Sequence, residues 1–318
     1  MEAAALAERP SALDLAGISH LVVEVGDLDK AVAFYSRVLG LKPIGTNILP
    51  GCGEHAALKC VSGQWVALVS NPARLDLREM GVHQAYRVSA AARAAIADRL
   101  AAEGIEVKSY KEDRSAEDGD NFYFFDPDGN RLQLVVTKNA TATDAISGID
   151  HVAVQVADIM WAEEFYTNEF RLAVDHRVGW KTADYARARK WAAGEEDMAP
   201  GTRRLDERYT VMVNRKKVPR ANMQIFVRVG GGSVLGVYLA NKHFQEPPEE
   251  QIVGAPRAAL IVASRASLDG AARLLASHGR AFEGPVAHAP TSPIEASLYF
   301  KDTGGNFLEL CVPRKSVS

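Results

Sequence analysis

Short runs of alternating apolar and polar residues recur along the chain and predict β-strands, interrupted by a few amphipathic helices. Residues 18–25 alternate and are rich in β-branched side chains, as in a half-buried strand. Between residues 31 and 38, apolar side chains recur at helical spacing, with Asp27 or Asp29 as the N-terminal cap and Gly40 as the stop. The chain is therefore predicted to open with a strand followed by a helix.

The same patterns predict short elements over much of the remaining chain. In the first half we expect a helix at 90–103 and strands at 41–44, 56–60, 65–69, 85–89, 121–125 and 131–137. In the second half we expect a helix at 268–278 and strands at 258–263, 297–301 and 306–312. This mixture of elements indicates an α+β fold.

An internal repeat organises the chain. Three residues of the first copy recur 131 positions later in the second: His20, Asp27 and Tyr35 match His151, Asp158 and Tyr166. The closing segments Tyr123–Gln133 and Tyr299–Glu309 match at an offset of 176, so the second copy carries an insertion of 45 residues. Ordered matches at both ends of each copy indicate a duplicated unit.

The repeat predicts two modules, 17–137 and 149–314, after an N-terminal tail at 1–16 and joined by a linker at 138–148. The insertion falls at about 179–222 and has a predicted helix near 183–193. Two interpretations of the insertion stay open. It is either a surface elaboration that contacts a partner subunit, or a lid over a substrate cavity.

Composition excludes several classes of partner. The formal net charge is −3, with 37 basic and 40 acidic residues, which indicates neither a nucleic acid nor an anionic membrane as partner. The three cysteines form no close pair, which favours a reducing compartment, and no apolar run is long enough to predict a membrane helix. We expect a cytoplasmic protein. Gly230–Gly232 is interpreted as a hairpin turn, and Arg215–Lys217 as a solvated basic cluster.

A strand that begins with histidine, a helix that ends in Phe34-Tyr35, and a closing hairpin of the form Tyr-Phe-x-Asp-Pro-x-Gly-Asn resemble the vicinal-oxygen-chelate (VOC) superfamily. That family includes glyoxalase I, bleomycin- and fosfomycin-resistance proteins and extradiol dioxygenases. The resemblance covers roughly 18–137 and 149–313. It implies two tandem VOC modules, each of paired βαβββ units that form a half-open barrel. It also implies one divalent metal held by the first, fifth and eighth strands.

The tandem layout is closest to catechol 2,3-dioxygenase. In that resemblance His243 and His288 stand where an active-site base is expected, and Tyr299 and Tyr123 where a donor to a developing oxyanion is expected. Glu309 stands at an iron-ligand position. The gap from His288 to Tyr299 is longer than in that family's signature.

The resemblance leaves several metal sites open. In the first module, His20, His83 and Gln133 stand at the three ligand positions, and Gln133 offers a neutral carbonyl oxygen in place of a carboxylate. In the second module His151 and Glu309 stand there, but Arg257 replaces the second histidine and has no lone pair to donate.

Arg257 is interpreted either as a ligand of a substrate carboxylate or as a salt-bridge partner of Glu309. A third layout takes ligands from both modules. It joins His151 to His83 and Gln133, or His20 to Arg257 and Glu309. We expect His20, His83 and Gln133 as metal ligands, with His151 and Glu309 as the second choice.

Three functional hypotheses follow from the resemblance. The first is an extradiol ring-cleaving dioxygenase that uses Fe(II), or Mn, Zn or Ni, with O₂ on a small catecholic or hydroxylated aromatic substrate. The second is a glyoxalase-type lyase or isomerase, in which the metal is a Lewis acid. The third is a metal-free protein that binds a small ligand. A homo-oligomer, by default a dimer, is expected in each case.

Overall fold

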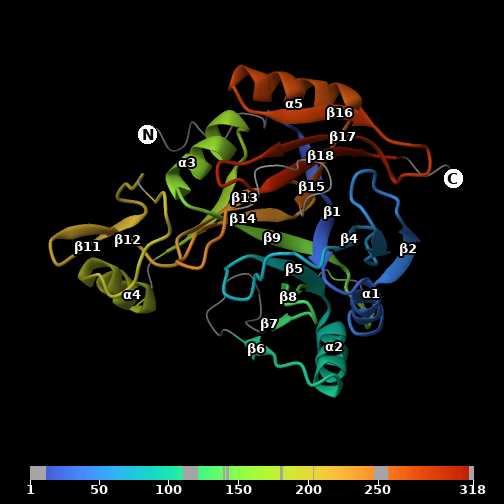
Figure 1. Ribbon diagram of the computed structural model, residues 1–318, viewed down its shortest axis with the longest axis horizontal. Helices are drawn as coiled ribbons and strands as arrows, with labels where there is room; N and C mark the ends of the chain where they lie inside the picture. Colours follow the sequence, from blue (N-terminus) through green and yellow to red (C-terminus); the bar gives the residue numbers. More distant parts are fainter. Residues whose placement is uncertain are drawn as a thin grey trace.

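The computed structural model describes residues 12–109, 121–138, 140, 143–179, 182–202, 204–246 and 257–314. Two eight-stranded mixed sheets dominate the described chain, and helices lie at the periphery (Figure 1). The predicted α+β class is confirmed. Residues 1–11 of the predicted tail, part of the linker and residues 247–256 lie outside the described residues, and the first strand begins at Leu15, inside the predicted tail.

The first sheet has the order β16–β17–β18–β15–β1–β4–β3–β2. Its strands are β1 (Leu15–Val25), β2 (Lys42–Thr46), β3 (His55–Lys59), β4 (Trp65–Ser70), β15 (Arg257–Val262), β16 (Phe282–Ala287), β17 (Ile294–Lys301) and β18 (Phe307–Pro313). The second sheet has the order β10–β13–β14–β9–β5–β8–β7–β6. Its strands are β5 (His83–Val88), β6 (Lys108–Ser109), β7 (Phe122–Phe125), β8 (Arg131–Val136), β9 (Gly148–Val156), β10 (Val174–Val178), β13 (Gln224–Arg228) and β14 (Val234–Leu239).

The helices are α1 (Leu28–Arg37), α2 (Ala90–Ala102), α3 (Ile159–Glu164), α4 (Thr182–Ala193) and α5 (Arg265–Ser277). A π-helical turn, Phe165–Glu169, continues α3. The predicted cap at Asp27 is present, because Asp27 accepts a hydrogen bond from the Lys30 amide. Asp158 caps α3 in the same way by accepting from the Trp161 amide. A small hairpin, β11 (Thr210–Val213) and β12 (Lys216–Pro219), belongs to the insertion.

The two copies share a buried hydrogen-bonded corner. The Tyr35 hydroxyl donates to Asp126 at 3.1 Å, and in the second copy Tyr166 donates to Asp302 at 2.8 Å. The turn residue Asn306 donates to the Gln155 carbonyl at 2.8 Å, as Asn130 does at the matching point of the first copy. These bonds tie the closing hairpin to the first strand and helix of the same module. They explain why the motif residues recur together.

Each sheet takes half of its strands from each module. β1 pairs antiparallel with β15, so the first half of module 1 joins the second half of module 2. β5 pairs antiparallel with β9, which joins the remaining halves. Of the ligand layouts left open by the sequence, the strand order therefore selects the one that crosses between modules.

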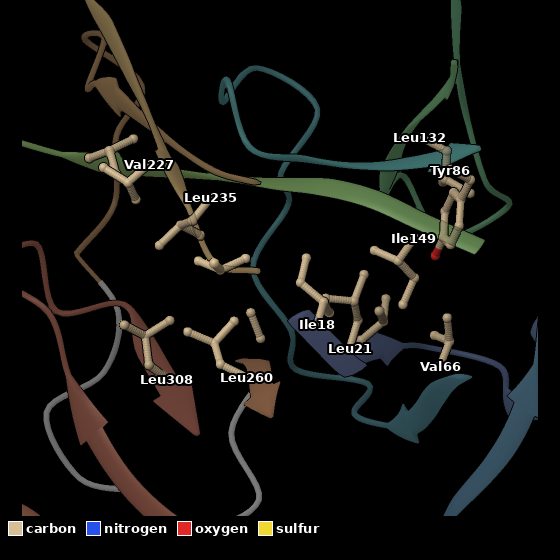
Figure 2. Packing of buried hydrophobic residues seen from close by; sticks show 14 of the residues in the cluster. Ile18, Leu21, Val66, Tyr86, Leu132, Ile149, Val227, Leu235, Leu260 and Leu308 are labelled. Atoms are coloured by element: carbon tan, nitrogen blue, oxygen red, sulfur yellow. The ribbon is translucent and has the colours of Figure 1, made fainter. Parts of the chain in front are cut away.

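The largest of three apolar clusters among the described residues fills the space between the sheets (Figure 2). Alternate residues of the central strands enter it, for example Leu21 of β1, Leu260 of β15 and Ile149 of β9. Because side chains alternate across a strand, the intervening residues lie on the opposite, concave face of each sheet. His20, Gln133 and His151 belong to this second set.

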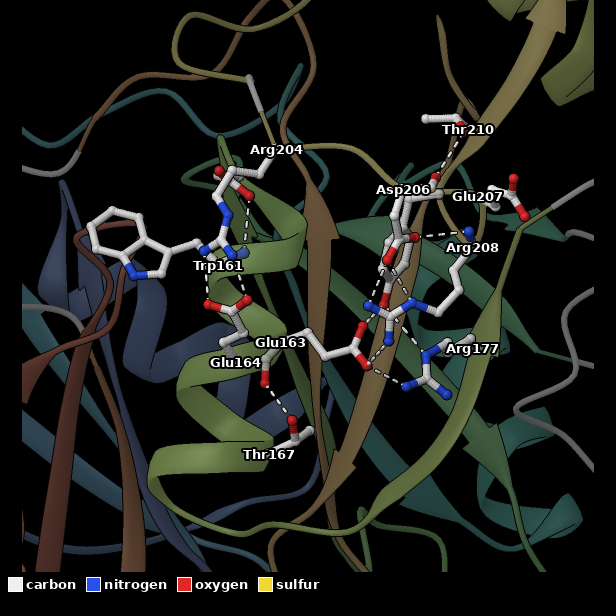
Figure 3. Close-up of polar contacts among 12 residues, drawn as sticks. Trp161, Glu163, Glu164, Thr167, Arg177, Arg204, Asp206, Glu207, Arg208 and Thr210 are labelled. Carbon is white, nitrogen blue, oxygen red and sulfur yellow. Dashed lines mark hydrogen bonds and ion pairs between the residues drawn. The ribbon is translucent and has the colours of Figure 1, made fainter. Parts of the chain in front are cut away.

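The insertion is fastened to α3 by charged groups (Figure 3). Glu163 is buried and accepts hydrogen bonds from Arg177 and Tyr209, and from Arg208 at 3.0 Å. Arg204 pairs with the neighbouring Glu164. The predicted helix of the insertion is present as α4, and its Ala188 packs against the β11–β12 hairpin.

The predicted Gly230–Gly232 turn joins β13 to β14 and lies against the start of β1. Gly230 has φ +85°, and a Cβ there would lie 2.1 Å from the Leu15 carbonyl oxygen. We expect Gly230→Ala to lower the free energy of unfolding by ~1–3 kcal/mol more than Gly63→Ala does. Gly63 also has a positive φ, +90°, but a Cβ there would meet no atom within 4 Å. Gly63→Ala therefore measures the cost of the positive φ alone. Urea denaturation measures both, and equal losses would contradict this packing.

Candidate functional site

Two clusters of buried polar side chains, named clefts below, lie at equivalent places on the faces of the sheets opposite the shared core. In the first sheet, His20 and Glu309 flank Ala259 in one row across β1, β15 and β18. In the second sheet, the same row is His151, Ala85 and Gln133, across β9, β5 and β8. The central alanine of each row leaves space for the longer flanking side chains to converge. The residue two positions before each alanine completes the cleft: Arg257 in the first sheet and His83 in the second.

The arginine cleft, formed by His20, Arg257 and Glu309, contains a buried ion pair. Nε of Arg257 donates to Oε2 of Glu309 at 2.5 Å, and Nε2 of His20 lies 3.4 Å from the same oxygen. All three side chains are fully buried. Burial alone would raise the pKa of Glu309, but the charges of Arg257 and His20 hold that pKa far below its usual value. Burial lowers the pKa of His20, with Glu309 opposing that shift.

Other groups complete the arginine cleft. The Ser297 hydroxyl donates to Oε1 of Glu309 at 2.5 Å and accepts from Nε2 of His288, 2.8 Å away. The Tyr299 hydroxyl lies 3.4 Å from the same His288 nitrogen. The indole of Trp65 stacks on His20 with the ring centroids 4.1 Å apart. The cleft interior is thus filled by the protein's own side chains.

The arginine cleft does not fit a metal ion. The guanidinium stays protonated, offers no lone pair and already neutralises Glu309. The salt-bridge interpretation of Arg257 thus matches the geometry, and recognition of a substrate carboxylate does not, since this side chain is fully buried against Glu309.

The histidine cleft, formed by His83, His151 and Gln133, has a different character. The Nε2 atoms of His83 and His151 face each other at 3.1 Å. Nδ1 of His83 lies 3.1 Å from the Gly81 carbonyl oxygen, and Nδ1 of His151 lies 2.7 Å from Oδ2 of Asp150. Each Nδ1 therefore carries the proton, and both Nε2 lone pairs point into the cleft. Two such lone pairs at this distance need a shared proton or a cation between them.

These residues fit a divalent metal. Two imidazole nitrogens bonded to one cation at about 2.1 Å, roughly at a right angle, lie about 3 Å apart, which matches the spacing in the cleft. Hydrogen bonds from Nδ1 to a carbonyl and a carboxylate are the usual supports of metal-binding histidines. Gln133 is fully buried on the same concave face and offers a carbonyl oxygen. Among the described residues no group of three His, Cys, Asp or Glu side chains is placed to hold a metal ion. The candidate set is therefore the two histidines with Gln133, all of them neutral.

Asp150 supports His151 and is itself held by a cation. Nε of Arg87 donates to Oδ1 of Asp150 at 2.9 Å. Burial by itself would raise the pKa of Asp150, but the hydrogen bond from His151 and the Arg87 charge keep it below the usual value. The carboxylate is thus ionised and sets the tautomer of His151.

Aromatic rings surround the histidine cleft. The rings of Tyr123 and Tyr238 each lie edge-on to His83 with centroids 5.6 Å away, and Phe226 lies edge-on to His151 at 5.9 Å. His176 stacks on Phe226 at 4.2 Å, and its Nδ1 lies 2.8 Å from Asp175. Sequence reasoning missed His176 and Asp150. The repeated dipeptide Asp-His, at 150–151 and 175–176, is the signal that could have indicated them.

The structure separates several of the predicted site residues. His20 belongs to the first sheet, and His83 and Gln133 to the second, so these three do not meet; the antiparallel joining of β1 to β15 is the reason. His151 and Glu309 are separated in the same way. His243 follows β14 in an exposed loop rather than a strand. His288 and Tyr299 lie in the arginine cleft, and Tyr123 alone of the predicted catalytic residues adjoins His83.

A cavity of about 480 Å³ is lined by residues of both sheets, from the middle of β1 and β9 and from the first residues of β5 and β15. Residues related by the repeat line it in pairs, such as Leu21 with Val152 and His83 with Arg257. Its wall is mainly apolar, and its size is that of a small-molecule pocket. His83 thus adjoins both this cavity and the histidine cleft.

Comparison with known proteins identifies the family. The model of the Glyoxalase/Bleomycin resistance protein/Dioxygenase superfamily matches residues 17–134 and 148–310, and the chain belongs to this family. Proteins of this family commonly use a divalent metal.

Two curated relatives are each 31% identical to this chain. Metallothiol transferase FosB of Shouchella clausii matches over 120 residues, which cover 37% of this chain and 78% of the relative. Glutathione transferase FosA of Serratia marcescens matches over 125 residues, which cover 38% and 82%. Each match is about as long as one module.

Two solved structures extend over nearly the whole chain. A putative dioxygenase from Bacillus subtilis covers 95% of this chain and 86% of its own, with TM-score 0.61 and 16% identity. Glyoxalase I from Zea mays covers 93% and 92%, with TM-score 0.58 and 15% identity. At this identity the similarity shows the fold. Within the described residues, no helix has the length and apolar character to cross a membrane.

The ion pair of the arginine cleft gives a stability prediction. Arg257→Met leaves the Glu309 charge buried without its main partner and should lower the free energy of unfolding by ~3–5 kcal/mol. The double variant Arg257→Met/Glu309→Leu should lose less than the single variant. The exposed pair of Arg228 and Asp175 is the control, and Arg228→Met should cost less than ~1 kcal/mol.

The ion pair of Arg257 and Glu309 also predicts that the stability of the fold falls at acid pH. Since the folded pKa of Glu309 is depressed, its contribution to stability is complete above the unfolded value of 4.5 and declines as the pH falls below it. Urea titrations between pH 7 and 3 should show a steeper loss for the wild type than for the double variant. If stability fell equally with pH in the wild type and the double variant, the depressed pKa of Glu309 would be contradicted.

Proposed function

We propose that the histidine cleft is the divalent metal centre of an enzyme that acts on a small oxygen-bearing molecule by Lewis-acid chemistry. The observation that carries the proposal is the convergence of the His83 and His151 Nε2 lone pairs, each fixed by a hydrogen bond at Nδ1. Gln133, opposite His151 in the same row, would be the third ligand.

The bound metal would polarise substrate oxygens and stabilise negative charge that develops on them. Because His83, His151 and Gln133 are neutral, they would leave the cation's full charge for the substrate, which favours an anionic or chelating oxygen ligand. The edge-on rings of Tyr123 and Tyr238 exclude water from this face of His83. His176, oriented by Asp175, is the candidate proton acceptor.

A Lewis-acid reaction, as in a glyoxalase-type lyase or isomerase, is favoured over extradiol ring cleavage. The residues expected to assist ring cleavage, His288 and Tyr299, lie around Glu309 and Arg257 in the arginine cleft. His243 lies in an exposed loop. Of the four, Tyr123 alone lies near His83. The names of the curated relatives describe transferases, and neither name describes ring cleavage.

Metal content tests the ligand assignment. Protein loaded with Mn(II) and desalted should retain about one equivalent, and His83→Ala or His151→Ala should reduce this at least tenfold. His243→Ala, which alters an exposed histidine, should leave it unchanged. Gln133→Glu adds a negative charge and should tighten metal binding about tenfold or more. Full occupancy in both cleft variants would eliminate the assignment and favour a metal-free binding protein.

Oxygen consumption separates the two chemistries. With the Fe(II)-loaded protein and a panel of catechols, we expect no oxygen uptake above that of His83→Ala, because three of the four predicted assisting residues, His243, His288 and Tyr299, lie away from this cleft. An oxygen electrode with a spectrophotometric assay for ring-cleavage product makes the measurement. Catechol-dependent uptake that His83→Ala abolishes would establish the dioxygenase instead.

A further inference from the structure

The cavity of about 480 Å³ is built symmetrically from the two copies of the repeat. Leu21 and Val23 of β1 line it together with Val152 and Val154, the residues 131 positions later in β9. The first residues of β5 and β15 line it as a further matched pair. The cavity therefore lies where the two modules meet.

This cavity is a different space from the histidine cleft. Val152 and Val154 pack against the shared core, whereas His151 projects from the other face of β9. Among the described residues that line the cavity, His83 alone belongs to the histidine cleft, and it stands at the first position of β5. A ligand in the cavity is therefore not a ligand of the proposed metal centre.

The core is incompletely filled on the side of the second module. Leu21 and Val23 are 2% and 4% exposed, while the matching Val152 and Val154 are only partly buried. Since β9 is a central strand flanked by β14 and β5, the exposed surface of these valines opens into the cavity. Protein interiors are normally close-packed, so apolar surface left open inside the fold indicates a place for a ligand.

Two loops that are related by the repeat cover the cavity. Residues 71–82 join β4 to β5, and residues 240–246 follow β14. The apolar side chains that these loops place at the cavity are Leu75, Leu77, Met80 and Phe244. Leu75 is 38% exposed. Apolar side chains on both covering loops extend the apolar wall of the strands to the mouth of the cavity, which favours an apolar ligand.

Two of the charged side chains at the cavity are paired within the protein. Arg74 donates to the main-chain oxygen of Asp128 at 2.7 Å and lies 3.1 Å from its carboxylate. Glu24 accepts a hydrogen bond from Asn71 at 2.8 Å. Both charges are therefore satisfied without a ligand.

The other charged side chains do not place a charge inside the cavity. The Arg257 side chain has no exposed surface and is paired with Glu309. The guanidinium of Arg131 lies over the ring of Tyr123, 4.5 Å from its centroid. Glu246 is exposed on its loop and stays hydrated. A charged ligand would lose hydration here without gaining an ion pair, so the cavity favours a neutral ligand.

We propose that this cavity is a second binding site, separate from the metal centre, for a neutral and largely apolar small molecule. Its volume of about 480 Å³ lies within the range of roughly 300–1,000 Å³ that ligand pockets have. The inference goes beyond the proposed function and needs no metal. Because the wall comes from both modules, a bound molecule should stabilise the folded chain.

Fluorescence titration with phenylnaphthylamine, a neutral probe whose emission rises in apolar surroundings, tests the site. We expect about one equivalent to bind per chain, with a dissociation constant on the order of 10 µM. Anilinonaphthalenesulfonate has the same rings and adds one sulfonate charge. It should bind at least tenfold more weakly, because the cavity offers that charge no partner.

A matched pair of variants localises the probe. Val154→Trp fills the cavity and should weaken phenylnaphthylamine binding at least tenfold. Val61→Trp makes the same change at a position that is 47% exposed and outside the cavity, and should leave binding unchanged. Saturating probe should raise the melting temperature of the wild type but not of Val154→Trp. If Val154→Trp does not fold, Leu77→Lys in the covering loop replaces it, with the same expected loss.

Chelator-treated protein and His151→Ala should bind the probe as the wild type does, because His151 does not line the cavity. This comparison separates failure of the cavity from failure of the metal centre, and loss of binding on metal removal would show that the two sites are not separate. No saturable rise in emission up to about 200 µM probe, or equal binding by the cavity-filling variant, would overturn the proposal. Equal or tighter binding of the sulfonate would overturn the choice of a neutral ligand.

Discussion

The antiparallel pairing of β1 with β15, and of β5 with β9, is the constraint on which the two clefts depend. Each pairing brings a first strand from one module beside a fifth strand from the other, and the eighth strand follows in parallel register. A histidine of one module thus meets the other module's residues across an alanine. If each sheet were built within one module, His20 would meet His83, and the chemistry of both clefts would differ.

The two clefts occupy equivalent positions in the repeat but contain different residues. In the first, a guanidinium occupies the position of a metal ligand and satisfies Glu309, so that a cation of the protein's own takes the place of a metal. In the second, the carboxylate has become the neutral Gln133 and both histidines remain. The carboxylate of Asp150 lies behind His151, held between His151 and Arg87.

The sequence predicted the repeat, the caps, and most strands and helices, because these follow from local periodicity and turn chemistry. It also selected candidate metal ligands whose side chains do lie on the sheet faces opposite the shared core. It could not choose among ligand sets, since which strands pair across modules is decided by the packing of a shared core such as Leu21, Leu260 and Ile149. His243 was misplaced because β14 ends at Leu239. The approach of α4 to β9 gave no local signal, because only tertiary packing brings these two elements together.

Anomalous X-ray scattering from Mn(II)-soaked crystals tests the central claim most directly. We predict one peak per chain, bonded to Nε2 of His83 and of His151 with Gln133 beside it, and no peak between His20 and Glu309. A peak in the arginine cleft, or none in the histidine cleft at full soaking, would contradict this account of the two clefts.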